Sequence, residues 1–154
     1  MRIQFAVIAL ATLGASGCSK EFDEYKERSK ATEGQLTLRR LVKSVQVALI
    51  RDNQYPIATT GLTPTASCCK SPGAKCVPDP AVWDAEPWKT LDFSIDDPFM
   101  YRVSYASDGK TFTAKVVADL DCDEQEDPRE VLSATGSVDA QGAPLVVYSD
   151  DKRP

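Results

Sequence analysis

Histidine is absent from this chain of 154 residues. Because its imidazole is the usual general base and a frequent metal ligand near neutral pH, Ser-His-Asp triads, Cys-His dyads and histidine-zinc sites are excluded. Positive charge is also scarce, since 18 lysines and arginines face 23 aspartates and glutamates, for a formal net charge of −5. An acidic surface argues against binding to nucleic acid and against binding to anionic lipids through a cluster of basic residues. With no catalytic motif in their place, the composition predicts a protein that is not an enzyme and binds no nucleic acid.

Long apolar runs are missing too, and one short run lies near the start. After Arg2 comes an apolar stretch at 5–13, followed by small residues at 14–17 and then Cys18. A membrane-spanning helix needs about 20 apolar residues, whereas a charged start, a short apolar middle and a small-residue end are typical of a secretory signal. Residues 1–17 are therefore predicted to be an export signal.

The cysteine at the end of this signal resembles the acylated cysteine of bacterial lipoproteins. In that pattern Cys18 becomes the lipid-modified N-terminus, and Ser19 behind it favours the outer membrane of a Gram-negative cell. Ala15 departs from the pattern, because lipoproteins usually carry leucine there. The resemblance implies an exported protein held at the periplasmic or surface face of a lipid bilayer through acylated Cys18. The alternative is an ordinary signal cut near Gly17, which would leave Cys18 as a spare thiol.

Cysteine is rare in the rest of the chain, but its count is even. The four residues are Cys68, Cys69, Cys76 and Cys122. An even number in an exported chain predicts two disulfides. A bond between the adjacent Cys68 and Cys69 would be strained, so one of them is expected to pair with Cys76 and the other with Cys122; the sequence does not decide which. The alternative, a four-cysteine zinc site, lacks the paired Cys-x-x-Cys spacing that such sites usually show.

Residues 20–53 contain no proline and are rich in helix formers. Apolar residues recur there at intervals of three and four and predict one buried helix face: Leu38, Leu41, Val45, Ala48 and Leu49. Tyr55-Pro56 should end the helix, because proline disfavours the helical conformation of the preceding residue. Residues 26–35 have few apolar side chains and are expected to stand free as a stalk; the alternative for residues 19–30 is a helix that frays near its tether. Residues 18–55 are thus expected to form a tether and an amphipathic helix.

Proline and cysteine concentrate in residues 56–98, which are expected to form a loop region stapled by disulfides. Trp83 and Trp88 should pack this region onto the core, with exposed ligand stacking as the alternative.

From residue 99 onward the apolar period becomes two, which predicts antiparallel strands at 99–105, 112–120, 130–137 and 145–148. A charged, disordered tail is expected at 149–154. The fold class is therefore α+β: a long N-terminal helix packed on a small antiparallel meander of residues 99–148.

Carboxylates crowd the segment after the second expected strand. They are Asp119, Asp121, Asp123, Glu124, Glu126 and Asp127. Alternating aspartates in a loop can bind Ca²⁺, which takes about six to eight oxygen ligands, so Asp119, Asp121 and Asp123 are candidate calcium ligands. The glycine that an EF-hand loop needs at its sixth position is missing, since Glu124 stands there. The favoured alternative is a solvated acidic turn held by Cys122, with no cofactor.

The order of several short motifs resembles that of type IV pilins and pseudopilins. The helix carries a Tyr-x-x-Arg-Ser-Lys-x-x-Glu motif from Tyr25 to Glu33. Further segments are similar to pilin-like heads, in the same order: 68–76, 88–93, 96–99, 105–114 and 119–123. The resemblance covers roughly residues 22–148 and implies a pilin-like αβ-roll, with the helix packed on the sheet. Some pseudopilins also bind calcium in a C-terminal loop.

One part of the family pattern is missing. Pilins begin with an apolar helix half that anchors the subunit and forms the filament core, and here a signal ending at Cys18 takes its place. Because function does not follow from fold alone, we expect a monomeric, lipid-anchored structural or interaction protein that is accessory to a type IV pilus or type II secretion system. The alternative is a Ca²⁺-dependent periplasmic or surface binding lipoprotein unrelated to pili.

Overall fold

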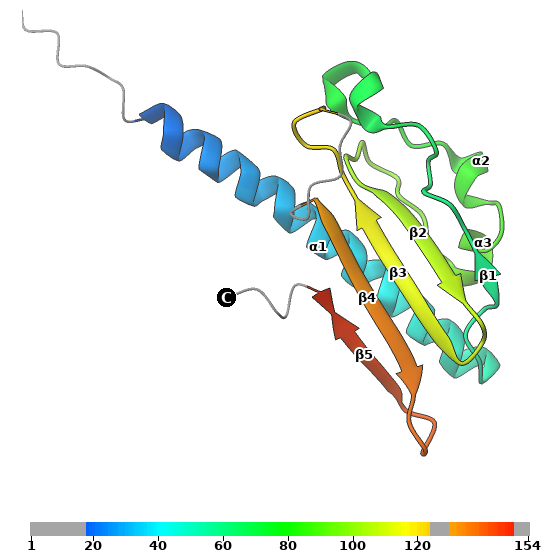
Figure 1. Ribbon diagram of the computed structural model, residues 1–154. Helices are drawn as coiled ribbons and strands as arrows, with labels where there is room; N and C mark the ends of the chain where they lie inside the picture. Colours follow the sequence, from blue (N-terminus) through cyan, green and yellow to red (C-terminus); the bar gives the residue numbers. More distant parts are fainter. Residues whose placement is uncertain (1–17, 124–129, 150–154) are drawn as a thin grey trace, which may run out of the picture.

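The computed structural model describes residues 18–123 and 130–149 (Figure 1). In the first part of helix α1, the described side chains are Tyr25 and those from Ser29 onward. The expected signal at 1–17, residues 150–154 of the expected tail, and Glu124, Glu126 and Asp127 lie outside the described residues.

Helix α1 spans Cys18–Asp52, and Asn53 after it has a left-handed φ of 56°. Its segment 29–52 packs on the sheet through six buried apolar residues: Leu38, Leu41, Val42, Val45, Ala48 and Leu49. The periodicity predicted five of the six. This packed segment is the part of the expected long helix that the structure supports. The expected free stalk at 26–35 is wrong for residues 30–35. The Tyr101 hydroxyl donates to the Lys30 carbonyl at 2.9 Å, and the Met100 N–H donates to Glu33 Oε1 at 3.3 Å.

The described strands form a five-stranded antiparallel sheet in the order β1-β2-β3-β4-β5, so each strand pairs with its neighbour in the chain. They are β1 (Ala58–Thr59), β2 (Arg102–Ser107), β3 (Thr111–Val117), β4 (Val131–Val138) and β5 (Pro144–Tyr148). The antiparallel meander was predicted, whereas β1 was not. The first predicted strand begins later than residue 99, because Phe99 exchanges backbone hydrogen bonds with Cys76 instead, at 2.7 and 3.2 Å.

Alternation along the strands places apolar side chains on the sheet face toward α1. The buried residues of this inner face are Val103, Tyr105, Phe112, Ala114, Val116, Leu132 and Ala134. Figure 1 shows α1 running along one face of the sheet, while no described element covers the other. That open face is mixed. Thr113 lies opposite Thr135, and Lys115 lies opposite Ser133 in the β3–β4 register. On the same face, Val147 lies opposite Thr135 and Leu145 lies opposite Ser137, and these two apolar side chains are 56% and 54% exposed. An antiparallel sheet with one buried and one solvated face is common.

Buried tyrosines tie the elements together through their hydroxyls. Tyr55 donates to the Ser137 carbonyl at 3.2 Å, and Tyr105 donates to the Pro56 carbonyl at 2.9 Å. The rings fill the core while each hydroxyl keeps a hydrogen-bond partner, as buried polar groups require. Burial raises the pKa of Tyr105 to about 12.

The connection from β1 to β2 contains four short helices where a loop region held by disulfides was expected. They are η1 (Cys68–Lys70), η2 (Pro72–Ala74), α2 (Pro80–Trp83) and α3 (Trp88–Leu91). Trp83 and Trp88 are only 5% and 3% exposed, and their rings meet edge to face with centroids 5.7 Å apart. Together with Phe93 and Phe99 they form an aromatic cluster that fastens the connection to the core, as predicted. The alternative of exposed ligand stacking is wrong.

A substitution at Gly34 tests how closely α1 packs against the sheet. A Cβ at this position would lie 2.6 Å from two ring carbons of Tyr101. Gly34→Ala should lower the free energy of unfolding by about 1–2 kcal/mol, because overpacking costs up to about 3 kcal/mol and exceeds the roughly 1 kcal/mol gained in helix propensity. Gly61→Ala is the control, since nothing lies within 4 Å of its Cβ. Urea denaturation measures both; an unchanged or higher stability of Gly34→Ala would contradict this packing.

Candidate functional site

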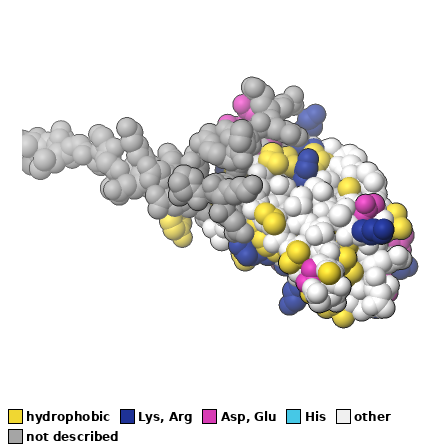
Figure 2. Space-filling model, turned by 60° about the horizontal axis from the view of Figure 1, so that its bottom comes forward, with side chains coloured by type: hydrophobic (Ala, Val, Ile, Leu, Met, Phe, Trp, Pro, Cys, Tyr) yellow, Lys and Arg dark blue, Asp and Glu magenta, His cyan; other side chains and the backbone are white. Residues whose placement is uncertain are grey.

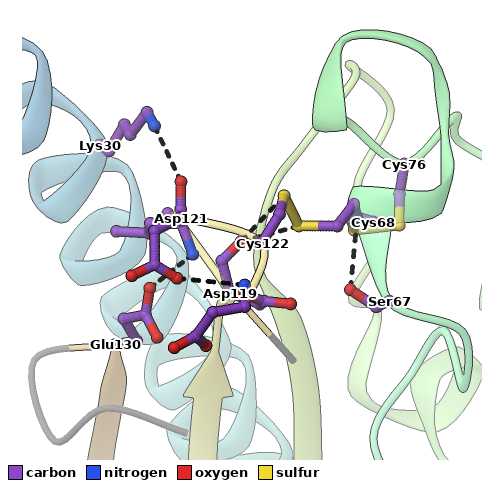
Figure 3. Close-up of a disulfide and its surroundings, with 11 residues drawn as sticks. Lys30, Ser67, Cys68, Cys76, Asp119, Asp121, Cys122 and Glu130 are labelled. Carbon is purple, nitrogen blue, oxygen red and sulfur yellow. Dashed lines mark hydrogen bonds between the residues drawn. A yellow bond between two sulfur atoms is a disulfide. The ribbon is translucent and has the colours of Figure 1, made fainter. Parts of the chain in front are cut away.

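Two disulfides lie at one end of the sheet within the described residues (Figure 3). Cys68 pairs with Cys76 across 8 residues, and Cys69 pairs with Cys122 across 53. The first bond closes the η1–η2 loop, and the second joins that loop to the segment after β3. The prediction of two disulfides without an adjacent pair is confirmed, and the structure decides the pairing that the sequence left open. The zinc alternative is wrong, because all four sulfurs are in disulfides.

The segment after β3, residues 119–123, is the acidic turn that the sequence predicted. Asp119 is half-buried, Asp121 and Asp123 are exposed, and one carboxylate oxygen of each lies within 4.8 Å of the others. The main-chain N–H of Asp123 donates to Asp119 Oδ1 at 3.0 Å and to Asp121 Oδ1 at 3.3 Å. Cys122 between them has a left-handed φ of 61°, which is uncommon outside glycine. The turn is therefore closed by its own carboxylates as well as by a disulfide.

Residues from two other elements hold this turn in place (Figure 3). Lys30 of α1 donates from Nζ to the Leu120 carbonyl at 3.2 Å. The main-chain N–H of Leu120 donates to the carboxylate of Glu130, directly before β4. The N–H of Ala118 donates to the Glu130 carbonyl at 3.0 Å. The acidic turn is thus a junction of the helix, the sheet and the disulfide-closed loop.

Sequence reasoning did not identify Lys30 and Glu130 as residues of this junction. Glu130 is 6% exposed, a buried charged side chain among the described residues. In the sequence it stands only as the first residue of a strand, and nothing in its neighbours signals burial. Lys30 belongs to the pilin-like helix motif, where the spacing indicates a surface position. Only the three-dimensional approach of α1 to the end of β3 brings these two residues together.

The oxygen atoms of the turn suit a hard cation such as Ca²⁺, and the cysteines are tied in disulfides and offer no thiolate. Three carboxylates supply fewer oxygens than the about six to eight that Ca²⁺ takes. Asp119 and Asp121 also each use a carboxylate oxygen to accept the Asp123 N–H. Among the described residues, the arrangement is complete as a turn and incomplete as a calcium site.

Two of the open grooves beside α1 lie toward opposite ends of its packed part. One of about 330 Å³ lies beside the acidic turn and is lined in part by Tyr25, Lys30, Lys75 and Met100. The other, of about 580 Å³, lies near the end of α1, between β1 and the residues that precede and form α3. Their linings mix polar and apolar groups, which suits contact surfaces for a partner.

No protein-family model matches the chain, and comparison with the curated proteins and with the solved structures gives no match. None of the helices in the described residues combines the length and apolar character needed to cross a membrane. The likeness to pilins in the motifs thus stays a resemblance.

The disulfides close chain segments of different length, which predicts different effects of their removal. In the chain-entropy model the bond that spans 53 residues contributes about 4 kcal/mol, and the bond that spans 8 contributes about 2.5 kcal/mol. Cys69→Ser/Cys122→Ser should therefore lower the free energy of unfolding more than Cys68→Ser/Cys76→Ser does. Denaturant unfolding of the oxidised proteins measures the difference.

Thiol alkylation of the denatured, unreduced wild-type protein is the control for this comparison. It should leave all four cysteines unmodified, because each is disulfide-bonded. Two or more alkylated positions, or equal losses of stability in the two double variants, would contradict the assignment.

Proposed function

We propose that this chain is an exported, lipid-anchored protein of the cell envelope that acts by presenting a pilin-like head to partner proteins. The observation that carries the proposal is the order of the elements: a helix that begins at Cys18, then a disulfide-closed connection, then an antiparallel meander packed on that helix. In this proposal the finer fold is a pilin-like αβ-roll with a long N-terminal helix. The motif order from Tyr25 to Asp123 supports the same assignment.

Export is supported by the disulfides. Disulfides form and persist in oxidising compartments such as the periplasm and the cell surface, and are rare in the cytosol. One bond closes a loop within the connection that is rich in proline, and the other ties that connection to the segment after β3. The signal-like residues 1–17 point to the same destination.

Anchoring is proposed through Cys18, the residue at which α1 begins. A single acyl chain binds a bilayer only marginally, whereas the several chains of a lipoprotein cysteine hold it stably. Acylation there would tether the head directly through its packing helix. The proposed location is the outer membrane of a Gram-negative bacterium, on its periplasmic or surface face.

The proposed partners are proteins of a type IV pilus or a type II secretion system, and the proposed role is non-catalytic. Filaments of the pilin family cohere through packing of apolar helix halves, and the polar residues Lys26, Glu27 and Arg28 stand where such packing would be needed. The protein is therefore proposed to be an accessory monomer. Its connection at residues 60–80 and its acidic turn are the proposed contact surfaces.

The anchor is tested by Cys18→Ser. Cells fed an alkyne fatty acid should label the wild-type protein and leave Cys18→Ser unlabelled, because acylation requires the thiol. Ser19→Ala is the matched control and should keep its label. Gel fluorescence after coupling to a dye measures the outcome, and equal labelling of wild type and Cys18→Ser would contradict the anchor.

A second candidate is calcium-dependent binding by a lipoprotein unrelated to pili, favoured by the closeness of the Asp119, Asp121 and Asp123 carboxylates. If it holds, calorimetry should detect Ca²⁺ binding that Asp121→Asn/Asp123→Asn abolishes, because two of the three carboxylates are lost. The exposed pair Asp96→Asn/Asp97→Asn removes the same charge elsewhere and should change nothing. The absence of binding heat with the wild-type protein would reject this candidate.

A further inference from the structure

Helix α1 carries a second apolar line on the side opposite the core. Tyr25, Leu36, Val47 and Ile50 are 70%, 59%, 54% and 74% exposed. Tyr25, Leu36 and Val47 are spaced 11 residues apart, which is about three helical turns, and Ile50 follows Val47 by about one turn. All four side chains therefore lie along one side of the helix, over a length of about 38 Å. We call these four residues, with Arg40 and Lys43 between them, the outer line. A surface helix usually presents polar residues there, so the outer line requires an explanation.

The outer line is basic, although the whole chain is acidic. Residues 29–52 contain five basic and two acidic residues: Lys30, Arg39, Arg40, Lys43 and Arg51 against Glu33 and Asp52. Of the two acids, Asp52 is paired with Arg51 at 2.7 Å. The face drawn in Figure 2 carries Lys and Arg side chains beside hydrophobic ones, with some Asp and Glu side chains among them. The net charge of the chain does not reveal this basic helix face, because it sums the charges of all faces.

Arginines border the outer line on both sides. Arg39 lies toward β5, with its guanidinium 4.9 Å from the centre of the Tyr148 ring. Arg40 lies toward the residues after α3, where it donates to the Ser94 carbonyl at 2.9 Å. Figure 1 shows β5 and α3 at opposite edges of the sheet. Positive charge therefore flanks the apolar line on both sides. One acidic residue, Asp92, lines a groove of about 330 Å³ together with Arg40, Lys43 and Val47.

A partner helix fits the outer line poorly. Leu36, Arg40, Lys43, Val47 and Ile50 follow one another at steps of four and three, the spacing of a coiled-coil seam. Two of these five seam positions carry cations, which a packed helix would have to bury at a cost in stability. A second copy of the chain would also bring the same cations against each other. The charge pattern disfavours both occupants.

We propose that the outer line is the face by which the head lies on an anionic phospholipid bilayer. A bilayer surface is flat over the length of the outer line, so its apolar side chains can all enter the boundary between the lipid headgroups and the acyl chains. Lys43 buries its stem and directs its charge to lipid phosphates, and Arg40 offers the guanidinium N–H groups that its hydrogen bond to Ser94 does not use. Tyr25 suits the same boundary, since its ring is apolar and its hydroxyl polar. The open sheet face, on the side of the sheet away from α1, then points away from the membrane.

Vesicle binding of the full chain tests this proposal in a Cys18→Ser background, where no acyl chain contributes. Arg40→Gln/Lys43→Gln should weaken partition into equimolar phosphatidylcholine–phosphatidylglycerol vesicles about 30-fold, since each cation near an anionic surface contributes about fivefold. Lys110→Gln/Lys115→Gln removes the same charge from other exposed positions and should leave binding within about twofold. Circular dichroism checks that both variants fold. Equal losses in the two variants would overturn the proposal.

Fluorescence quenching identifies the contacting face directly. Ile50→Trp places a reporter on the outer line, and Thr135→Trp places one on the open sheet face. Brominated lipids in the same anionic vesicles should quench the first variant by more than they quench the second. Equal quenching, or quenching of Thr135→Trp alone, would overturn the proposal. Two other results would also overturn it. One is a dimer seen in sedimentation velocity that Arg40→Gln/Lys43→Gln makes more stable. The other is a photocrosslinker at position 50 that captures an acidic protein in cells in place of lipid.

Discussion

The packing of α1 on the inner face of the sheet is the contact on which the rest of the molecule depends. A single antiparallel sheet must bury one face, and six apolar residues of α1 provide the cover. At about 1.5–3 kcal/mol for each fully buried aliphatic side chain, this stripe contributes on the order of 10 kcal/mol before conformational entropy opposes it. One helix covers only a narrow strip of the sheet. The remaining core is closed by the aromatic cluster around Trp83 and by the disulfide-linked connection.

The acidic turn illustrates how tightly that closure is built. Lys30 from α1, Glu130 directly before β4 and Cys69 from the connection all meet residues 119–123. The aspartates that suggested a metal site also accept the main-chain N–H that closes the turn. This convergence favours a rigid contact surface at one end of the head, and the outer line of α1 adds a second surface of opposite charge.

The sequence predicted the elements that have a regular period. The helical repeat of Leu38, Leu41 and Val45 and the alternation around Val103 and Tyr105 led to the helix and to most of the sheet. Strand β1 was missed because two residues, Ala58 and Thr59, have no period to detect. The even cysteine count predicted two bonds, but the choice between Cys68 and Cys69 depended on a contact across 53 residues. The burial of Glu130 likewise arises only where β3 and β4 come together.

The central claim is that this folded head is exported and held at a membrane by lipid on Cys18. Intact-mass analysis of the protein purified from native membranes tests that claim most directly. The account predicts a chain that begins at Cys18, carries diacylglyceryl and N-acyl groups, and contains two disulfides. A mass that starts at Met1, or an unmodified chain cut near Gly17, would contradict it.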